Sequence, residues 1–154
     1  MRSIADRAEQ VLGSAVVATT PVAGGDICIS TRLRLTDGRS ALMKTRTNAP
    51  EGFFESEARG LRWLAEADAV PVAEVLAVAP DCLIVGWVEP TRPSAEHAVA
   101  LGRDLAGLHR AGADAFGNAE PGFIGPLPLA PGTTDSWADF YAAKRVLPYL
   151  KLAS

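Results

Sequence analysis

Apolar positions along the first part of the chain follow two different periods, which predict helices and strands in turn. Residues 3–12 carry apolar side chains at helical spacing and are followed by Gly13, so they predict a short amphipathic helix. Three segments with β-branched or alternating apolar residues come next, at residues 15–20, 27–35 and 40–45. Short turn segments separate them, so we expect an antiparallel meander.

A second helix and two further strands complete this pattern. Residues 51–67 predict a helix whose apolar stripe is formed by Phe54, Ala58, Leu61, Leu64 and Ala65. Strands are expected at residues 74–78 and 83–88. The order β-β-β-α-β-β predicts an α+β fold with a five-stranded antiparallel sheet and one main helix.

The pattern changes after residue 88. Residues 89–93 contain two prolines and predict a linker, or hinge, between a domain at residues 1–88 and a second body at residues 94–154. In the second body Ser94 is an expected N-cap of a helix that runs to Arg110. Its expected buried stripe consists of Ala98, Leu101, Leu105 and Leu108.

The last part of the chain is expected to combine a long loop with one more helix. Residues 112–134 are rich in glycine and proline and predict a loop. The final helix is expected to begin near Asp135 and to run towards Pro148, with Trp137, Phe140 and Tyr141 available for packing.

Composition narrows the class of protein. The chain has 154 residues, 48% of them hydrophobic, and a net charge of −3, so it is expected to fold and not to bind nucleic acid through bulk charge. No apolar run approaches the roughly 18 residues of a membrane span. Its two cysteines cannot build a disulfide framework, and we therefore expect a cytoplasmic protein.

Three features carry candidate chemistry. Gly24-Gly25-Asp26 stands between two predicted strands, where glycine lets backbone N–H groups approach a phosphate, although a two-glycine hairpin is more often an ordinary turn. Lys44 lies near the end of a predicted strand, where a lone lysine is usually a solvated edge charge. Glu57 falls on the apolar face of its helix, so it either extends to the rim or needs a cation, for which Lys44 is the best candidate.

The order glycine loop, strand lysine, helix glutamate, two strands and linker resembles the small lobe of protein-kinase-like phosphotransferases. A closer similarity covers nearly the whole chain in one register. Its motifs lie at residues 24–30, Lys44, residues 54–61, 83–88, 101–109, 122–125, 137–140 and 144–145. On these motifs the chain resembles the fructosamine/ketosamine kinase family, relatives of the aminoglycoside phosphotransferases.

The resemblance implies an ATP site and an acceptor. Its nucleotide-binding residues would be Gly24, Gly25, Asp26, Ile27, Lys44, Glu57, Val85, Gly86 and Val88. Val85 would be the gatekeeper, while the carbonyl of Gly86 and the N–H of Val88 would meet the adenine edge. The implied acceptor is the 3-hydroxyl of a ketosamine sugar, in a glycated amine or protein, and the implied role is protein deglycation.

One family feature does not occur in the printed sequence. Members of the family carry a His-Gly-Asp-Leu-Trp-x-x-Asn catalytic loop and a later aspartate that binds Mg²⁺, and neither motif occurs here. We therefore expect residues 94–154 to be the first helices of an incomplete α-helical large lobe, with no catalytic or metal-binding residue. The chain is expected to be inactive by itself and to self-associate through exposed apolar helix faces.

Other readings remain open at this point. An aminoglycoside- or choline-type phosphotransferase would use the same small lobe, and a non-catalytic nucleotide-binding module would need no catalytic loop.

Cys28 follows the glycine loop and is either a packed thiol or a redox-responsive one. Arg32 and Arg34 project from one strand face, where both are expected to be solvated.

Overall fold

The chain forms two compact units. The computed structural model describes residues 3–153, with the first unit ending at Arg110 and the second beginning at Ala111. The predicted linker at residues 89–93 lies inside the first unit, because the helix that follows it belongs to this unit as well.

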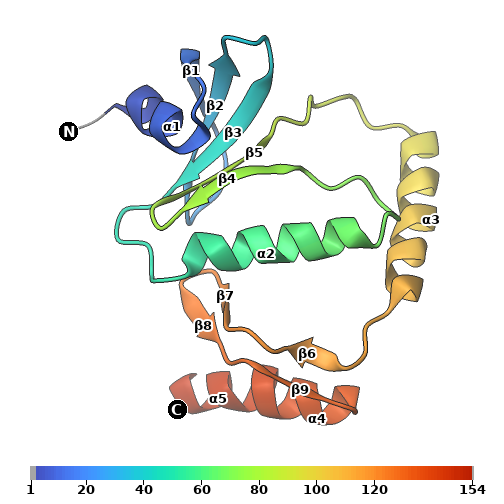
Figure 1. Cartoon of the computed structure of the whole chain (residues 1–154). Helices are drawn as coiled ribbons and strands as arrows, with labels where there is room; N and C mark the ends of the chain where they lie inside the picture. Colours follow the sequence, from blue (N-terminus) through green and yellow to red (C-terminus); the bar gives the residue numbers. More distant parts are fainter. Residues whose placement is uncertain (1–2, 154) are drawn as a thin grey trace. The chain divides into compact units, whose positions relative to one another are not determined.

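The first unit is built on the predicted five-stranded antiparallel sheet (Figure 1). Its strands are β1 (Val16–Val22), β2 (Ile29–Leu35), β3 (Ser40–Thr45), β4 (Val75–Ala79) and β5 (Cys82–Gly86). They lie in the order β1-β2-β3-β5-β4, so β1 and β4 form the edges. Three predicted boundaries were wrong by two residues: β1 ends two residues later than expected, β2 begins two residues later, and β5 ends at Gly86, before residues 87 and 88.

Helix α1 (Ile4–Leu12) covers one face of this sheet. Gly13 ends it, as the sequence predicted, and has a left-handed φ of 68°. At its start Ser3 and Asp6 form a reciprocal capping box, which was not predicted. Ala8 of α1 packs on a buried cluster of sheet residues. These are Leu33, Leu35, Ala41, Met43, Cys82 and Ile84.

Helix α2 (Phe53–Glu66) runs along the other face of the sheet. Phe54 and Ala58 of the predicted stripe are fully buried, but Leu64 and Ala65 near the end of the helix are exposed, so the stripe was only half right. The helix begins at Phe53, two residues later than predicted, after Gly52 with a positive φ. The buried end of α2 is therefore the end that carries Glu57.

Helix α3 (Ala95–Ala111) starts where the sequence placed it, since the Ser94 hydroxyl accepts a hydrogen bond from the N–H of His97. Its predicted buried stripe was wrong: no residue of α3 is buried in the described chain. Leu101 and Leu105 are both exposed. An apolar stripe specifies a face that prefers burial, but not a partner that covers it.

The second unit contains four short strands where a loop was predicted. Strand β6 (Phe116–Asn118) pairs with β9 (Gly132–Thr134), and β7 (Gly122–Ile124) pairs with β8 (Leu127–Leu129). A strand of three residues is too short to show an alternation of apolar and polar side chains. The glycine and proline content of residues 112–134 therefore predicted a loop instead. A Cβ at Gly117 would lie 2.3 Å from the carbonyl oxygen of Gly132, and this close backbone approach requires glycine.

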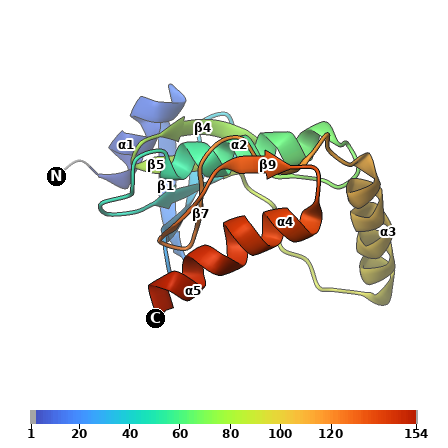
Figure 2. The ribbon, with the colours of Figure 1, turned by 90° about the horizontal axis from the view of Figure 1, so that it is seen from below.

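The second unit ends in one helical rod, visible in Figure 2. It consists of α4 (Trp137–Tyr141), a π-helical turn (Ala142–Val146) and α5 (Leu147–Ala153). Ser136 caps it, one residue after the predicted start. The three aromatic residues expected to be available for packing contact one another, since Trp137 packs on Phe140 and Tyr141. None of the helices within residues 3–153 combines the length and hydropathy that crossing a bilayer requires.

Candidate functional site

The central feature of the site is an ion pair between β3 and α2. Lys44 lies opposite Ser30 of β2 and Leu83 of β5, so its side chain leaves the sheet face on which α2 packs. Its Nζ is 2.5 Å from Oε1 of Glu57, and the two side chains are 26% and 34% exposed. The pairing inferred from the helix face is therefore present, and both groups keep access to solvent.

The glycine loop leads directly to this ion pair. Gly24 and Gly25 have φ values of 108° and 85°, which only glycine adopts without strain. Both glycines and the following Asp26 and Ile27 are exposed between β1 and β2. Since β2 then places Ser30 opposite Lys44, the loop lies at the end of the sheet where the lysine amine emerges.

Cys28 lies within the electrostatic reach of the same ion pair. Burial raises the pKa of its thiol; the positive charge of Lys44 opposes this shift, and the negative charge of Glu57 adds to it. The thiol is half-buried and is not in a disulfide. A raised pKa keeps this sulfur protonated near neutral pH, so the local environment does not activate it as a nucleophile.

The predicted adenine edge lies at the end of β5. Val85 is buried and stands opposite Leu42 of β3, on the face that carries Lys44. The N–H of Gly86 donates to the carbonyl of Glu74 at 2.8 Å, a bond that holds the end of β5 beside the residue before β4. Val88 is 70% exposed, and among residues 3–153 its N–H has no backbone acceptor.

Three residues beside this edge, Arg32, Trp87 and Glu89, form a set of contacts that the sequence did not predict. Arg32, expected to be solvated, instead places its guanidinium carbon 4.4 Å from the ring centroid of Trp87 and donates to Glu89 at 3.2 Å. The indole N–H of Trp87 donates to the same Glu89 oxygen at 2.7 Å. The alternation of side chains along a strand could have drawn attention to Arg32, because it places this residue on the same face of the sheet as Ser30 and Lys44.

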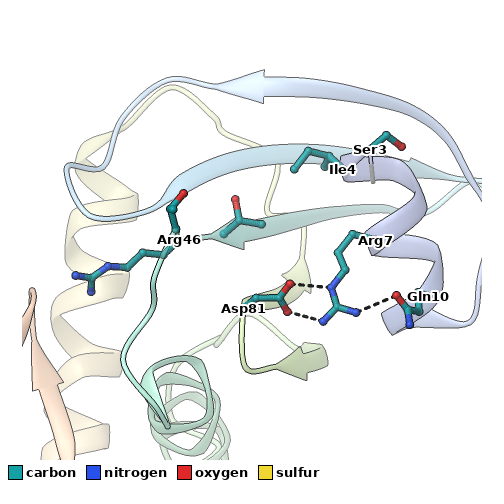
Figure 3. A pocket seen from close by; sticks show the side chains of 8 residues that line it. Ser3, Ile4, Arg7, Gln10, Arg46 and Asp81 are labelled. Carbon is teal, nitrogen blue, oxygen red and sulfur yellow. Dashed lines mark hydrogen bonds and ion pairs between the residues drawn. The ribbon is translucent and has the colours of Figure 1, made fainter. Parts of the chain in front are cut away.

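A separate cavity of about 500 Å³ opens between α1 and the end of β3. Figure 3 shows the Arg7 guanidinium meeting both carboxylate oxygens of Asp81, with Gln10 beside it, while the Arg46 side chain extends away from this group. The hydrogen bonds from Arg7 hold the pKa of Asp81 below its usual value. These contacts tie α1 to the turn between β4 and β5, which is a structural role.

Metal ligands are not gathered anywhere in the described part of the chain. Residues 3–153 contain no group of three or more histidine, cysteine, aspartate or glutamate side chains placed to hold a metal ion. The chemistry derived below assigns no metal ligand to these residues.

Comparison with known proteins gives one consistent family. The family model described as fructosamine kinase matches residues 1–154. A protein of Thermus thermophilus described as a probable ketoamine kinase is 38% identical over 131 residues, which are 85% of this chain and 46% of that protein. A chloroplastic protein-ribulosamine 3-kinase of Arabidopsis thaliana is 31% identical over 86% of this chain and 42% of its own length.

Solved structures show the same relationship. A crystal structure from Thermobifida fusca, assigned as a fructosamine-3-kinase, matches with a TM-score of 0.89 and 36% sequence identity. The match covers 98% of this chain and 54% of that chain. The chain thus spans about half the length of the relatives it matches.

Proposed function

The chain belongs to the fructosamine kinase family, and from this premise we propose that it binds ATP for phosphoryl transfer to a ketosamine. The observation that carries the proposal is the Lys44–Glu57 ion pair beside an exposed glycine loop. In kinase chemistry a strand lysine pairs with the α- and β-phosphates, and a helix glutamate fixes that lysine.

Each predicted nucleotide-binding residue has a role consistent with its position. The amides of Gly24, Gly25, Asp26 and Ile27 would cover the phosphates, because the loop is exposed and free of large side chains at its glycines. Lys44 would meet the phosphates while Glu57 holds its amine. The carbonyl of Gly86 and the N–H of Val88 would pair with adenine, with Val85 closing the pocket behind the base.

The acceptor follows from the relatives. One is described as a ketoamine kinase and another as a protein-ribulosamine 3-kinase. We propose that the whole protein phosphorylates the 3-hydroxyl of a ketosamine sugar, such as a fructosamine or ribulosamine on a glycated amine or protein, and serves protein deglycation.

The catalytic base and the metal ligands are the parts that the printed sequence does not supply. We propose that residues 1–88 act as the nucleotide-binding lobe, that residues 89–93 act as its hinge and that residues 94–154 begin the large lobe. The 154-residue chain would then bind ATP but transfer no phosphoryl group by itself, because the catalytic-loop motif that would orient the acceptor hydroxyl does not occur in the printed sequence.

The test is titration of the chain with ATP, followed by an assay for phosphorylation of a synthetic fructosamine. We expect saturable ATP binding that Lys44→Met weakens at least tenfold, with far-UV circular dichroism unchanged. Absence of ATP binding by the unaltered chain would overturn the proposal. ATP-dependent phosphorylation of the fructosamine by this chain would confirm the reaction and overturn the proposed inactivity.

Two lesser proposals concern the surroundings of the protein. Exposed Leu101 and Leu105 on α3 support self-association, which sedimentation velocity over a range of concentrations would detect. The two free thiols, Cys28 and Cys82, support a reducing compartment such as the cytoplasm.

A further inference from the structure

A polar network joins β2 to the chain segment that follows β5. The segment consists of residues 87–94 and is called here the β5–α3 connection. Arg32 of β2 links this connection to the sheet. Its guanidinium donates to Glu89 in the connection and to the hydroxyl of Ser40 in β3, the latter at 3.4 Å. The backbone N–H of Trp87 donates to the carbonyl of Ser40 at 3.2 Å, so β3 holds the start of the same connection.

The network holds both neighbours of Val88 in place. On one side the Trp87 ring lies under the Arg32 guanidinium, and its indole N–H donates to Glu89. On the other side Glu89 receives hydrogen bonds from Trp87 and Arg32 on one carboxylate oxygen. Val88 between them is exposed, and no backbone carbonyl within residues 3–153 accepts from its N–H, so the direction of that N–H depends on these two neighbours.

Arg32 makes three favourable contacts: a hydrogen bond to Ser40, a charge-assisted hydrogen bond to Glu89 and a cation–π contact with Trp87. Hydrogen bonds to a charged group are stronger than neutral ones, and a guanidinium over an indole adds a cation–π attraction. The side chains of Arg32 and Glu89 are 38% and 68% exposed, so solvent screens the ion pair and each term is modest. Together they restrict a short exposed segment that no other described element covers.

We propose that Arg32 is a positioning residue that orients the β5–α3 connection for recognition of the nucleotide base. The proposal rests on the proposed function, because it assumes that Val88 meets the adenine edge. Arg32 acts only through Trp87 and Glu89. It should therefore affect the part of ATP that contacts the connection, which is the base, and not the triphosphate, which Lys44 and the glycine loop would hold.

The test compares two ligands that share the triphosphate. ATP and inorganic tripolyphosphate are titrated into the unaltered chain, Arg32→Met, Lys44→Met and the matched control Arg34→Met. Arg34 lies on the same strand face as Arg32 and is exposed, so its variant loses the same charge. We expect Arg32→Met to weaken ATP about tenfold and to leave tripolyphosphate unchanged, while Lys44→Met weakens both.

A spectroscopic readout checks the route through Trp87. Arg32→Met is expected to shift the tryptophan emission of the chain but not that of a Trp87→Phe background. Should Arg32→Met fail to fold, Glu89→Gln breaks the network from its exposed end and carries the same prediction for ATP against tripolyphosphate.

The outcomes separate the two proposals. Equal ATP affinity in Arg32→Met and Arg34→Met would overturn the positioning role and leave the proposed function intact. A parallel loss of ATP and tripolyphosphate affinity in Arg32→Met would also overturn it, since that pattern indicates a general charge effect. No ATP binding by the unaltered chain would overturn the proposed function and this inference together.

Discussion

Lys44 and Glu57 meet across the gap between a strand and a helix, with 2.5 Å between amine nitrogen and carboxylate oxygen. The two residues belong to different elements and are separated by a loop and the start of α2. Ser30, which follows the glycine loop, lies opposite Lys44, so the ion pair holds the amine at the end of the sheet where this loop ends.

Removing the carboxylate tests whether this arrangement serves ligand binding. Glu57→Gln keeps the size of the side chain but abolishes the charge that holds Lys44. We expect ATP affinity to fall about tenfold, with a change in the free energy of unfolding below about 1 kcal/mol. The matched control is Glu66→Gln, an exposed carboxylate of the same helix. Calorimetric titration and thermal unfolding measure the two effects, and equal ATP affinities in both variants would contradict the prediction.

Glycine at position 25 is required for its backbone conformation. Gly25→Ala places an L-residue at a φ of 85°, although the added Cβ would find ordinary contact, 3.5 Å from the carbonyl oxygen of Cys28. We expect a loss of about 1 kcal/mol in the free energy of unfolding, from strain alone, and weaker ATP binding as the loop shifts.

Gly60 gives the opposite result and controls for the change in residue type. It lies inside α2, where an added Cβ has nothing within 4 Å. Gly60→Ala should therefore raise the free energy of unfolding by about 0.5–1 kcal/mol, because alanine loses less backbone entropy in a helix. Urea denaturation measures both variants, and a stabilising Gly25→Ala would be evidence against the loop geometry.

The Arg7–Asp81 ion pair should make stability depend on acid. The pKa of Asp81 is lowered in the folded chain, so the pair contributes stability above the unfolded pKa of about 4 and loses it as the pH falls. At pH 7 we expect Asp81→Asn to cost about 0.5–1 kcal/mol, the range for a partly exposed pair. The stability difference from the unaltered chain should shrink as the pH falls from 5 towards 2. Asp114→Asn, at an exposed position, should show no such convergence.

The two thiols should react in a fixed order. Burial raises the pKa of Cys82 to about 11 and also raises that of the half-buried Cys28. Iodoacetamide at pH 7.5 should therefore modify Cys28 slowly and Cys82 only after unfolding, because the thiolate is the reactive form. Lys44→Met removes the positive charge that lowers the Cys28 pKa, so it should slow this reaction further. Peptide mass spectrometry gives both rates; rapid native labelling of Cys82 would contradict its burial.

The sequence predicted the long helices and strands of this chain, whose apolar residues recur at regular spacing, but not its shortest strands. The placement of Glu57 on an apolar helix face predicted a buried-side partner, and Lys44 provides it. Arg32 was misjudged because a strand arginine looks solvated until a segment from a distant part of the sequence, at Trp87 and Glu89, comes beside it. The strands between Phe116 and Thr134 were missed because three residues carry no detectable period.

The sequence by itself determined most of the helices and strands, because capping residues, positive-φ glycines and apolar spacing act between close neighbours along the chain. It also contained the family motifs, and hence the expectation of a nucleotide site. Only the tertiary structure decided which groups meet, above all the stacking of Arg32 on Trp87 and the exposure of the α3 stripe. Such contacts depend on the register and packing of distant segments, which no local pattern specifies.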